Sequence, residues 1–190
     1  MSNKKICIVG LGYVGLPLVV AFTKVNKVTA FDINVQRIAE LQSGYDKTLE
    51  VDAVSLNLAN SHINYVSDIK KAADCDIYII TVPTPISENK KPDLSYLKLA
   101  SEMVGGIIDK ENIIIYESTV YPGATEDFCV PILEQNSELK LNKDFYCGYS
   151  PERINPGDRS YRLEDIVKVT SGSNPTIAIE IDELYQKIIP

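Results

Sequence analysis

Three glycines lie close together near the start of the sequence, at Gly10, Gly12 and Gly15, between an apolar run at 6–9 and a segment with a helical pattern. The GxGxxG spacing alone is a weak signal, but a strand before it and a helix after it are the context in which such a loop binds a dinucleotide. In that context Gly10 permits a tight turn, Gly12 lets the backbone approach a pyrophosphate, and Gly15 lets the helix pack closely against the sheet. The unpaired N–H groups at the start of the helix then face the phosphates. A glycine turn without a ligand is the alternative interpretation.

Short β-rich runs alternate with helical patterns along the rest of the chain, which is typical of a parallel sheet with crossover helices. The pattern predicts strands at residues 5–9, 28–32, 63–66, 77–82, 113–117, 145–148 and 166–170. It predicts helices at residues 14–24, 35–42, 69–73, 94–108, 125–135 and 175–189. The run at 77–82 is largely apolar, as in strands that are buried on both faces of a sheet. We therefore expect one α/β domain over residues 1–190, a doubly wound Rossmann-type fold whose mostly parallel sheet has six or more strands with helices on both faces.

Composition limits the classes of partner. The chain has 190 residues and a net charge of −7 without a long basic run, which makes nucleic acid and anionic membranes poor partners. The uncharged run at 6–23 has the length of a membrane span, but its glycines and Pro17 fit a buried strand that turns into a buried helix. The four cysteines are far apart and show no metal-binding or redox spacing, so we expect free thiols, no metal site and a cytoplasmic protein.

Asp32 ends the second predicted strand, 22 residues after Gly10. A carboxylate there accepts hydrogen bonds from an adenosine ribose hydroxyl and repels a 2′-phosphate. Because no arginine follows Asp32 immediately, the sequence favours NAD over NADP as the cofactor. Arg37 lies in the first turn of the next predicted helix, within reach of the adenosine side of the cofactor. A solvated arginine on the helix surface is the alternative.

Three loops follow the fourth, fifth and sixth predicted strands, and each carries polar residues. Ligands of open α/β sheets bind outside the carboxyl ends of the strands, so these loops are expected to line one crevice. Thr84 lies between two prolines that fix its backbone, although a merely stiffened loop fits the same pattern. The hydroxyl residues at 118–119 are expected beside the nicotinamide end. In the third loop Glu152 is a candidate acid, base or water-positioning group, and the candidates for phosphate or sugar contacts are Arg153 and Asn155.

Histidine- and cysteine-based chemistries find little support. His62 is the only histidine and lies in a polar stretch where a surface position is expected, which argues against a Ser–His–Asp site or a histidine relay. Cys147 lies near the end of the sixth predicted strand, and a nucleophilic thiol is one interpretation. We favour a small buried hydrophobic role for this cysteine and for the other three.

Four motifs, in this order, resemble the NAD-binding domain of the UDP-glucose/GDP-mannose dehydrogenase family: residues 10–17, 82–85, 118–123 and 150–153. The resemblance covers essentially the whole chain, and those enzymes oxidise the sixth carbon of a nucleotide sugar from alcohol to acid with two NAD⁺ per turnover. It implies cofactor contacts by Gly10, Gly12, Tyr13, Val14, Gly15, Asp32, Arg37, Thr84 and Thr119. It also implies catalytic roles for Thr119 and Glu152, with Glu152 assisting the water and proton chemistry of the second half-reaction.

Two departures from the family pattern matter. The UDP-glucose branch carries a second glutamate where this chain has Pro156, and the segment 150–157 is more similar to the branch that oxidises UDP-N-acetylhexosamines for surface polysaccharides. The family's nucleophilic cysteine, its lysine and its asparagine lie in later segments, and no residue of this chain matches their motifs. The resemblance therefore implies the NAD-binding part of a longer, homodimeric or larger enzyme, without the central helical and C-terminal nucleotide-sugar domains and inactive by itself. Another β-hydroxyacid-type dehydrogenase and a non-catalytic NAD-sensing module are the alternatives.

Overall fold

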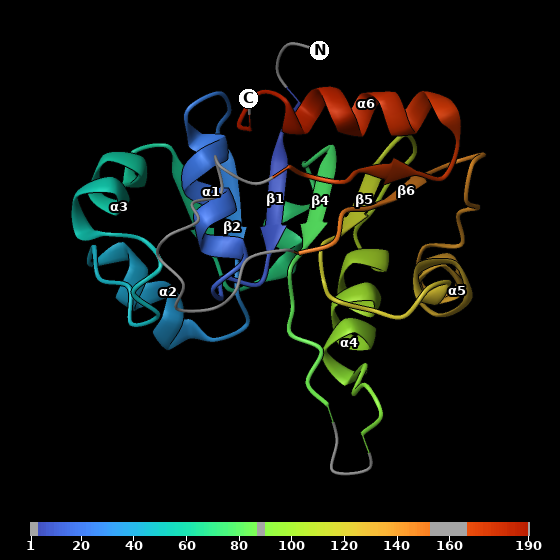
Figure 1. Ribbon diagram of the computed structural model, residues 1–190, viewed down its shortest axis with the longest axis horizontal. Coiled ribbons are helices and arrows are strands. Elements are labelled where there is room, and N and C mark those ends of the chain that lie inside the picture. The colour runs from blue at the N-terminus through green and yellow to red at the C-terminus, as the bar shows by residue number, and fades with distance from the viewer. Residues whose placement is uncertain (1–3, 87–89, 153–166, 190) are drawn as a thin grey trace.

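The computed structural model describes residues 4–86, 90–152 and 167–189. A seven-stranded sheet runs through the middle of the molecule in the order β3-β2-β1-β4-β5-β6-β7 (Figure 1). Its strands are β1 (Ile6–Val9), β2 (Val28–Phe31), β3 (Ile63–Val66), β4 (Ile77–Ile80), β5 (Ile113–Tyr116), β6 (Tyr146–Tyr149) and β7 (Ser171–Gly172). Neighbouring strands from β3 across to β6 are parallel, and β7 pairs antiparallel with β6. The strand order reverses direction between β1 and β4, so the predicted Rossmann-type sheet is confirmed.

Helices cover both faces of this sheet, as expected (Figure 1). They are α1 (Gly15–Thr23), α2 (Val35–Gln42), α3 (Ala53–Asn60), α4 (Ser95–Gly105), α5 (Val130–Ser137) and α6 (Pro175–Tyr185), with a 3₁₀ turn η1 (Ile69–Ala72) and a π-helical turn η2 (Thr125–Cys129). On one face Phe22 of α1 and Ile181 of α6 belong to the same buried cluster. On the other face a second cluster holds Leu97 of α4 and Leu133 of α5.

The central strand β4 is buried on both of its faces. Ile77 and Ile79 belong to one cluster, Tyr78 and Ile80 belong to the other, and all four are at most 2% exposed. Side chains of a strand alternate between the two faces of a sheet, so a strand between two helical layers needs apolar residues at every position. The prediction made from the apolar run at 77–82 is confirmed.

Helix α3 was not predicted from the sequence. The carboxylate of Asp52 caps it by accepting a hydrogen bond from the backbone N–H of Ser55 at 2.9 Å. Only Leu56 and Ala59 of the helix are buried, whereas Val54 and Leu58 are 71% and 73% exposed. Apolar residues on the solvent side blur the helical periodicity, which explains why the pattern gave no signal here.

The strand expected at 166–170 is displaced in the structure. Residues 167–170 are not in a strand, residue 166 lies outside the described residues, and the strand that pairs with β6 is β7. Val167 and Val169 are 79% and 51% exposed, so their alternation does not mark a buried face. Gly172 lies against α6, where an added Cβ would come 2.3 Å from the backbone nitrogen of Ala178. The close approach of the helix therefore fixes the short strand at this glycine.

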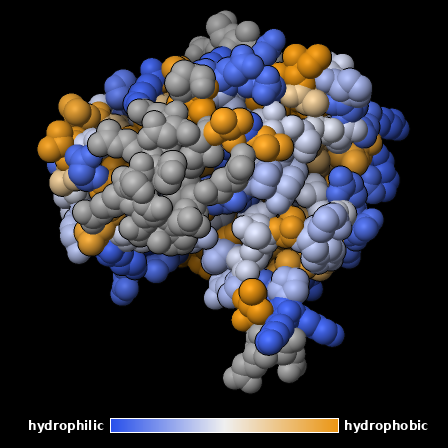
Figure 2. All heavy atoms as spheres, viewed as in Figure 1, coloured by the Kyte–Doolittle hydropathy of each residue, from blue (hydrophilic) through white to orange (hydrophobic). Residues whose placement is uncertain are grey.

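Four loops begin together at the carboxyl edge of the sheet. The ladder continues one residue past β1, β4, β5 and β6, because the backbone N–H groups of residues 10, 81, 117 and 150 each donate to the last carbonyl of the neighbouring strand, at 2.8–3.0 Å. The loops that carry most of the predicted site residues therefore start from fixed positions. On the face shown in Figure 2, hydrophobic residues lie in small separate groups among hydrophilic ones. No helix in the described ranges is both long enough and apolar enough to cross a membrane.

Candidate functional site

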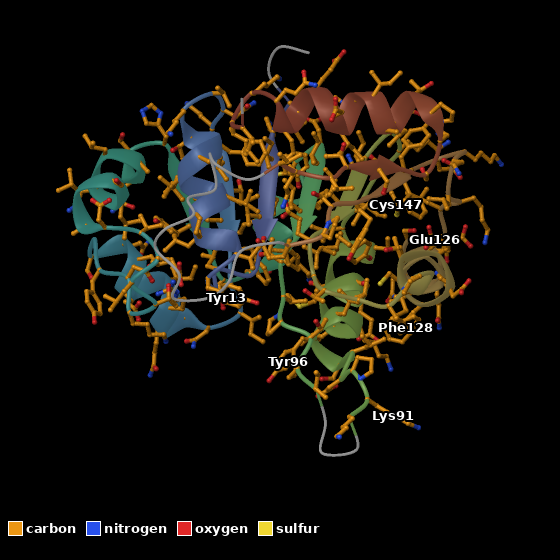
Figure 3. All side chains as sticks on the ribbon, viewed as in Figure 1. Tyr13, Lys91, Tyr96, Glu126, Phe128 and Cys147 are labelled. Atoms are coloured by element: carbon orange, nitrogen blue, oxygen red, sulfur yellow. The ribbon has the colours of Figure 1, made fainter. Side chains whose placement is uncertain are left out.

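A cavity of about 430 Å³ opens at the carboxyl edge of the sheet, between the strand ends and the first turns of α4. This volume is within the usual range for small-molecule sites. Among the predicted site residues the structure brings together eight around this cavity: Gly10, Gly12, Tyr13, Val14, Asp32, Thr84, Thr119 and Glu152. Gly15 and Arg37 do not line it, and Arg153 and Asn155 lie outside the described residues. Figure 3 shows Tyr13 and Tyr96, which both line the cavity, beyond the carboxyl edge of the sheet.

A different physical reason explains each glycine of the loop. Gly10 has a φ of +98°, a backbone angle that residues with a side chain rarely adopt. At Gly15 an added Cβ would lie 1.9 Å from the carbonyl oxygen of Gly10, so only glycine lets α1 start this close to the loop. At Gly12 an added Cβ would meet no atom within 4 Å. Protein packing therefore does not require a glycine at position 12. We attribute the glycine to the open space that it leaves for a ligand beside the backbone.

The start of α1 is left open to a ligand. No side chain caps this helix, and no acidic residue stands in its first turn. The N–H of Leu16 donates to the Gly12 carbonyl at 3.1 Å, and the helix dipole favours an anion beside this N-terminus. The hydroxyl of Thr81 holds the loop in place by donating to the Gly10 carbonyl at 2.7 Å.

Asp32 is half-buried at the end of β2 and holds two backbone N–H groups. Its Oδ2 accepts from Leu11 at 2.9 Å, and its Oδ1 accepts from Asn34 at 2.8 Å. A carboxylate offers about four acceptor positions, so both oxygens retain capacity for further donors. Because Asp32 lines the cavity beside the glycine loop, a ribose diol is a fitting donor.

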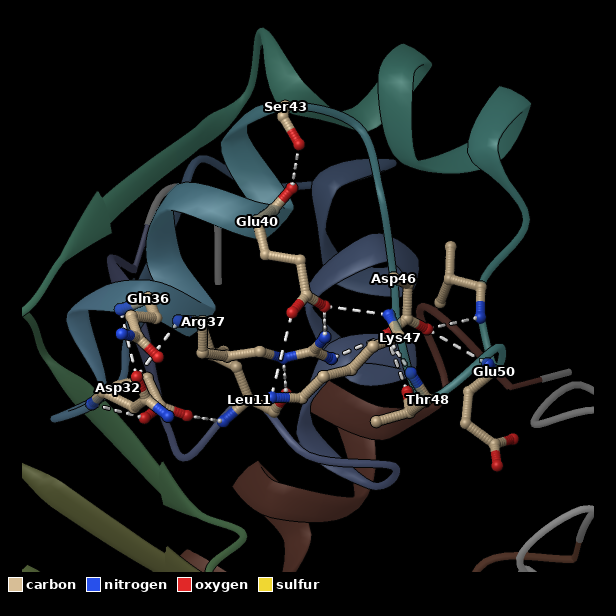
Figure 4. Close-up of polar contacts among 12 residues, drawn as sticks. Leu11, Asp32, Gln36, Arg37, Glu40, Ser43, Asp46, Lys47, Thr48 and Glu50 are labelled. Carbon is tan, nitrogen blue, oxygen red and sulfur yellow. Dashed lines mark hydrogen bonds and ion pairs between the residues drawn. The ribbon is translucent and has the colours of Figure 1, made fainter.

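Arg37 is buried beneath the glycine loop rather than solvated (Figure 4). It is 4% exposed, so the alternative of a solvated arginine is wrong. Its Nε donates to the Leu11 carbonyl at 2.9 Å, Nη2 pairs with Asp46 at 2.7 Å, and Nη1 pairs with Glu40. These contacts support the loop from below, and the predicted contact between Arg37 and the cofactor stays a prediction.

Asp46 anchors this arrangement. Its carboxylate accepts hydrogen bonds from Arg37, from the hydroxyl and backbone of Thr48, and from the backbones of Glu50 and Val51. Burial works to raise the pKa of Asp46, but the bonds from Thr48 and Arg37 outweigh it and lower the pKa below its usual value. No sequence pattern indicates this contact, because Asp46 lies nine residues from Arg37 in an irregular segment.

The loops after β4 and β5 are tied to each other across the cavity. The hydroxyl of Thr84 donates to the carbonyl of Thr119 at 2.6 Å, and the hydroxyl of Ser118 donates to the carbonyl of Val82 at 2.6 Å. Thr84 is thus held in one orientation, whereas Thr119 is an exposed residue that lines the cavity.

Glu152 lies in a group of charges that includes two residues the sequence analysis missed. Glu117, whose side chain is fully buried, pairs with Lys168 and accepts a hydrogen bond from the hydroxyl of Tyr185. Lys168 Nζ lies 4.0 Å from Glu152 Oε2, and the two side chains are 5% and 6% exposed. Burial raises the pKa of Glu117 above its usual value, against the opposing effects of Lys168 and Tyr185. The available signal was a charged residue in each of two β-rich runs, with Glu117 at the end of the run at 113–117 and Lys168 within the run at 166–170.

The cysteines and the histidine have the places expected of them. All four cysteines are free and buried. Cys147 on β6 does not line the cavity, and burial raises the pKa of its thiol well above the usual value (Figure 3). His62 is exposed before β3. The structure therefore offers no activated thiol or histidine among the residues lining the cavity.

Comparisons with known proteins agree with this geometry. The sequence profile of the UDP-glucose/GDP-mannose dehydrogenase family, NAD binding domain, matches residues 4–189. The chain belongs to this family. The predicted family and its cofactor, NAD, are thereby confirmed, and the alternative of another β-hydroxyacid-type dehydrogenase is set aside.

Similar proteins are longer than this chain. It is 56% identical to UDP-N-acetyl-D-glucosamine 6-dehydrogenase of Pseudomonas aeruginosa, over 100% of the chain and 44% of the relative, and 49% identical to Protein CapL of Staphylococcus aureus, over 98% and 44%. The solved structure of a UDP-D-ManNAc dehydrogenase from Pyrococcus horikoshii matches with a TM-score of 0.88 and 30% identity, over 98% of this chain and 45% of that one. The chain thus spans less than half the length of these relatives.

Proposed function

We propose that this chain is the NAD-binding part of a nucleotide-sugar 6-dehydrogenase that oxidises a UDP-N-acetylhexosamine at its sixth carbon to the uronic acid, using two NAD⁺ per sugar. The observation that carries the proposal is one cavity lined by the glycine loop, Asp32 and Glu152. Two relatives named UDP-N-acetyl-D-glucosamine 6-dehydrogenase, 56% and 55% identical over the whole chain, support the class of sugar.

The residues present fit NAD along the sheet edge. The open space at Gly12 and the uncapped start of α1 suit a pyrophosphate, and Asp32 suits the adenosine ribose. β2 and β6 are separated by three strands, so Asp32 and the loop bearing Glu152 lie at strand ends about 19 Å apart at the usual strand spacing. When bound, NAD supplies a hydride acceptor. We assign its nicotinamide end to the loops of Thr84, Thr119 and Glu152.

Glu152 is assigned the proton chemistry of this end of the cavity. A hydride leaves an alcohol only as its hydroxyl proton is removed, and oxidation to the acid then needs an activated water. Glu152 lines the cavity, and we assign its carboxylate to orienting that water or taking its proton. Thr119 is exposed on the adjacent loop, and we assign its hydroxyl to contact with substrate or cofactor.

Other parts of the proposal concern the rest of the enzyme. Arg153 and Asn155 remain candidates for contacts with the sugar or its phosphates. We place the nucleophilic cysteine and the uridine-binding residues in sequence beyond this chain, and the enzyme in the cytoplasm, as a homodimer or larger assembly acting in polysaccharide synthesis. The family's domain organisation and the 44% coverage of the relatives support this division.

The test uses the full-length protein that carries this chain. We expect NADH to form with UDP-N-acetylglucosamine or UDP-N-acetylgalactosamine, and Glu152→Gln to slow turnover by about 10²–10⁴-fold while NAD affinity changes less than about twofold. Glu126→Gln is the matched control, because Glu126 is exposed on η2 and does not line the cavity.

Two results would contradict the proposal. Unchanged turnover in Glu152→Gln would reduce Glu152 to a structural role. Tight NAD binding without turnover of any nucleotide sugar by the full-length protein would favour the NAD-sensing module instead.

A further inference from the structure

Four buried polar side chains meet at one end of the cavity, and we name them the Lys168 cluster: Glu117, Glu152, Lys168 and Tyr185. The side chains of Glu117, Lys168 and Glu152 are 0%, 5% and 6% exposed. Lys168 Nζ lies 5.5 Å from the centre of the Tyr185 ring, on its face. The proposed function uses only Glu152 of this cluster, so the buried lysine has no role yet.

The charges of the cluster do not balance. Two carboxylates face one ammonium, and Tyr185 contributes a neutral O–H that donates to Glu117. A buried carboxylate without a cation or donors is strongly disfavoured and takes up a proton instead. Among the described residues, Glu117 contacts Lys168 and Tyr185, and Lys168 Nζ lies 4.0 Å from Glu152 Oε2. Removal of the lysine therefore affects Glu152 directly.

The two residues that follow Lys168 are held in place by hydrogen bonds. The hydroxyl of Ser150 donates to the carbonyl of Val169 at 2.8 Å, and the hydroxyl of Thr170 donates to Asp182 on α6 at 3.1 Å. Ser150 is two residues before Glu152, and Val169 directly follows Lys168. The hydrogen bond between Ser150 and Val169 therefore holds the segments that carry Glu152 and Lys168 next to each other. An ammonium has three donors, enough to contact both carboxylates and still lie over the Tyr185 ring.

We propose that Lys168 is a positioning residue whose ammonium bridges Glu117 and Glu152, keeping Glu152 ionised and directed into the cavity at neutral pH. The effect on Glu152 follows from the cluster alone, and only its consequence for turnover rests on the proposed function. The fully buried Glu117 holds Lys168 by an ion pair, and the hydroxyl of Tyr185 on α6 holds Glu117 by a hydrogen bond. The competing role for Lys168 is that of a counter-ion for Glu117 only.

The first experiment measures the titration of the glutamates by ¹³C NMR of their carboxyl groups. In Lys168→Met we expect the apparent pKa of Glu152 to rise by about one pH unit or more, a tenfold change in its protonation constant, and in Lys168→Arg to return most of the way. Tyr185→Phe is the matched control, because it removes a donor to Glu117 and leaves the ion pair with Glu152. A folded Lys168→Met whose Glu152 titrates as in the unchanged protein would overturn the proposal.

Loss of a buried cation can prevent folding, so a second comparison keeps the test decisive. Glu117→Gln removes one carboxylate, and the double variant Glu117→Gln/Lys168→Met then keeps Glu152 as the one charged member of the Lys168 cluster. We expect Glu152 to titrate at higher pH in the double variant than in Glu117→Gln. Equal titration in the two variants would show that the lysine acts on Glu117 only.

The kinetic experiment separates this inference from the proposed function. In the full-length enzyme, the acid limb of the pH profile of kcat should move to higher pH in Lys168→Met, because a glutamate with a raised pKa becomes protonated earlier as the pH falls. KM for NAD should stay within about twofold, and Lys168→Arg should restore the limb. If Glu152 titrates differently in Lys168→Met but the limb does not move, the inference stands and the proposed role of Glu152 fails.

Discussion

The hydroxyl of Tyr185, on the last helix, donates a hydrogen bond to the buried carboxylate of Glu117, directly after β5. The same ring packs edge-on against Phe22 of α1, with 6.0 Å between ring centres. Burial raises the pKa of Tyr185 well above its usual value, so the hydroxyl keeps its proton and remains a donor. Two helices on one face of the sheet, α1 and α6, are thus connected through Tyr185 to a buried acidic residue that lines the cavity.

The first prediction concerns the choice of cofactor. Asp32→Ala removes a charge and an acceptor, so we expect NAD binding to weaken by about 1.5–3 kcal/mol. NADP should lose less binding free energy, because its 2′-phosphate is no longer repelled. The difference in affinity between NAD and NADP should therefore become smaller. Titration calorimetry with both cofactors measures this. Asp52→Ala is the control, because Asp52 caps α3 and does not line the cavity. Equal losses for NAD and NADP would refute the role of Asp32 in selectivity.

The second prediction separates two glycines of one motif. Gly12→Ala should fold as well as the unchanged chain, since its Cβ meets nothing within 4 Å, but should weaken NAD binding by narrowing the approach to the backbone. Gly15→Ala should lower the melting temperature strongly, since its Cβ would lie 1.9 Å from the Gly10 carbonyl oxygen. Thermal melts without ligand and calorimetry with NAD test both. A Gly12→Ala variant with full affinity for NAD would show that no ligand passes close to this backbone.

Local patterns carried most of what the sequence predicted. The glycine loop, Asp32 and the fully apolar β4 depend on neighbours within a few residues, and the structure confirms their places. The missed relationships join distant positions: Lys168 and Glu117 are 51 residues apart, and Tyr185 and Glu117 are 68 apart. No periodicity within a strand or helix encodes such contacts. The displacement of β7 has the same origin, because the approach of α6 to Gly172 is a tertiary contact.

The third prediction concerns the buried pair of Arg37 and Asp46. Breaking a buried ion pair typically lowers the free energy of unfolding by about 3–5 kcal/mol. Asp46→Asn leaves the guanidinium paired with Glu40 and the Leu11 carbonyl, so we expect a decrease near the lower end of that range. The pKa of Asp46 is lowered in the folded chain, so its contribution is present above the unfolded value of about 3.9 and is lost as the pH falls through the folded value.

Urea unfolding at several pH values tests this third prediction. The difference in unfolding free energy between the unchanged chain and Asp46→Asn should be largest at neutral pH and should shrink below about pH 4. Asp74→Asn is the control, because Asp74 pairs with Lys5 at an exposed position and contributes little. A difference that stays constant down to low pH would show that the ionised carboxylate is not what stabilises the loop.

The last prediction is that the 190-residue chain binds NAD but catalyses nothing by itself. Hydride transfer requires the sugar's sixth carbon about 3–3.5 Å from its acceptor, and the binding energy that holds a substrate there comes largely from its non-reacting parts. The loops of Thr84, Thr119 and Glu152 line the cavity, and we assign them to one wall of the substrate site. Calorimetry should therefore detect NAD, and absorbance should detect no NADH with UDP-N-acetylglucosamine or UDP-N-acetylgalactosamine.

Cys147→Ser should leave NAD binding unchanged, and the native Cys147 thiol should resist thiol reagents until the chain unfolds, because it is 3% exposed and burial raises its pKa. Steady NADH formation that Cys147→Ser abolishes would contradict both the placement of the nucleophile beyond this chain and the assignment of Cys147 to the core.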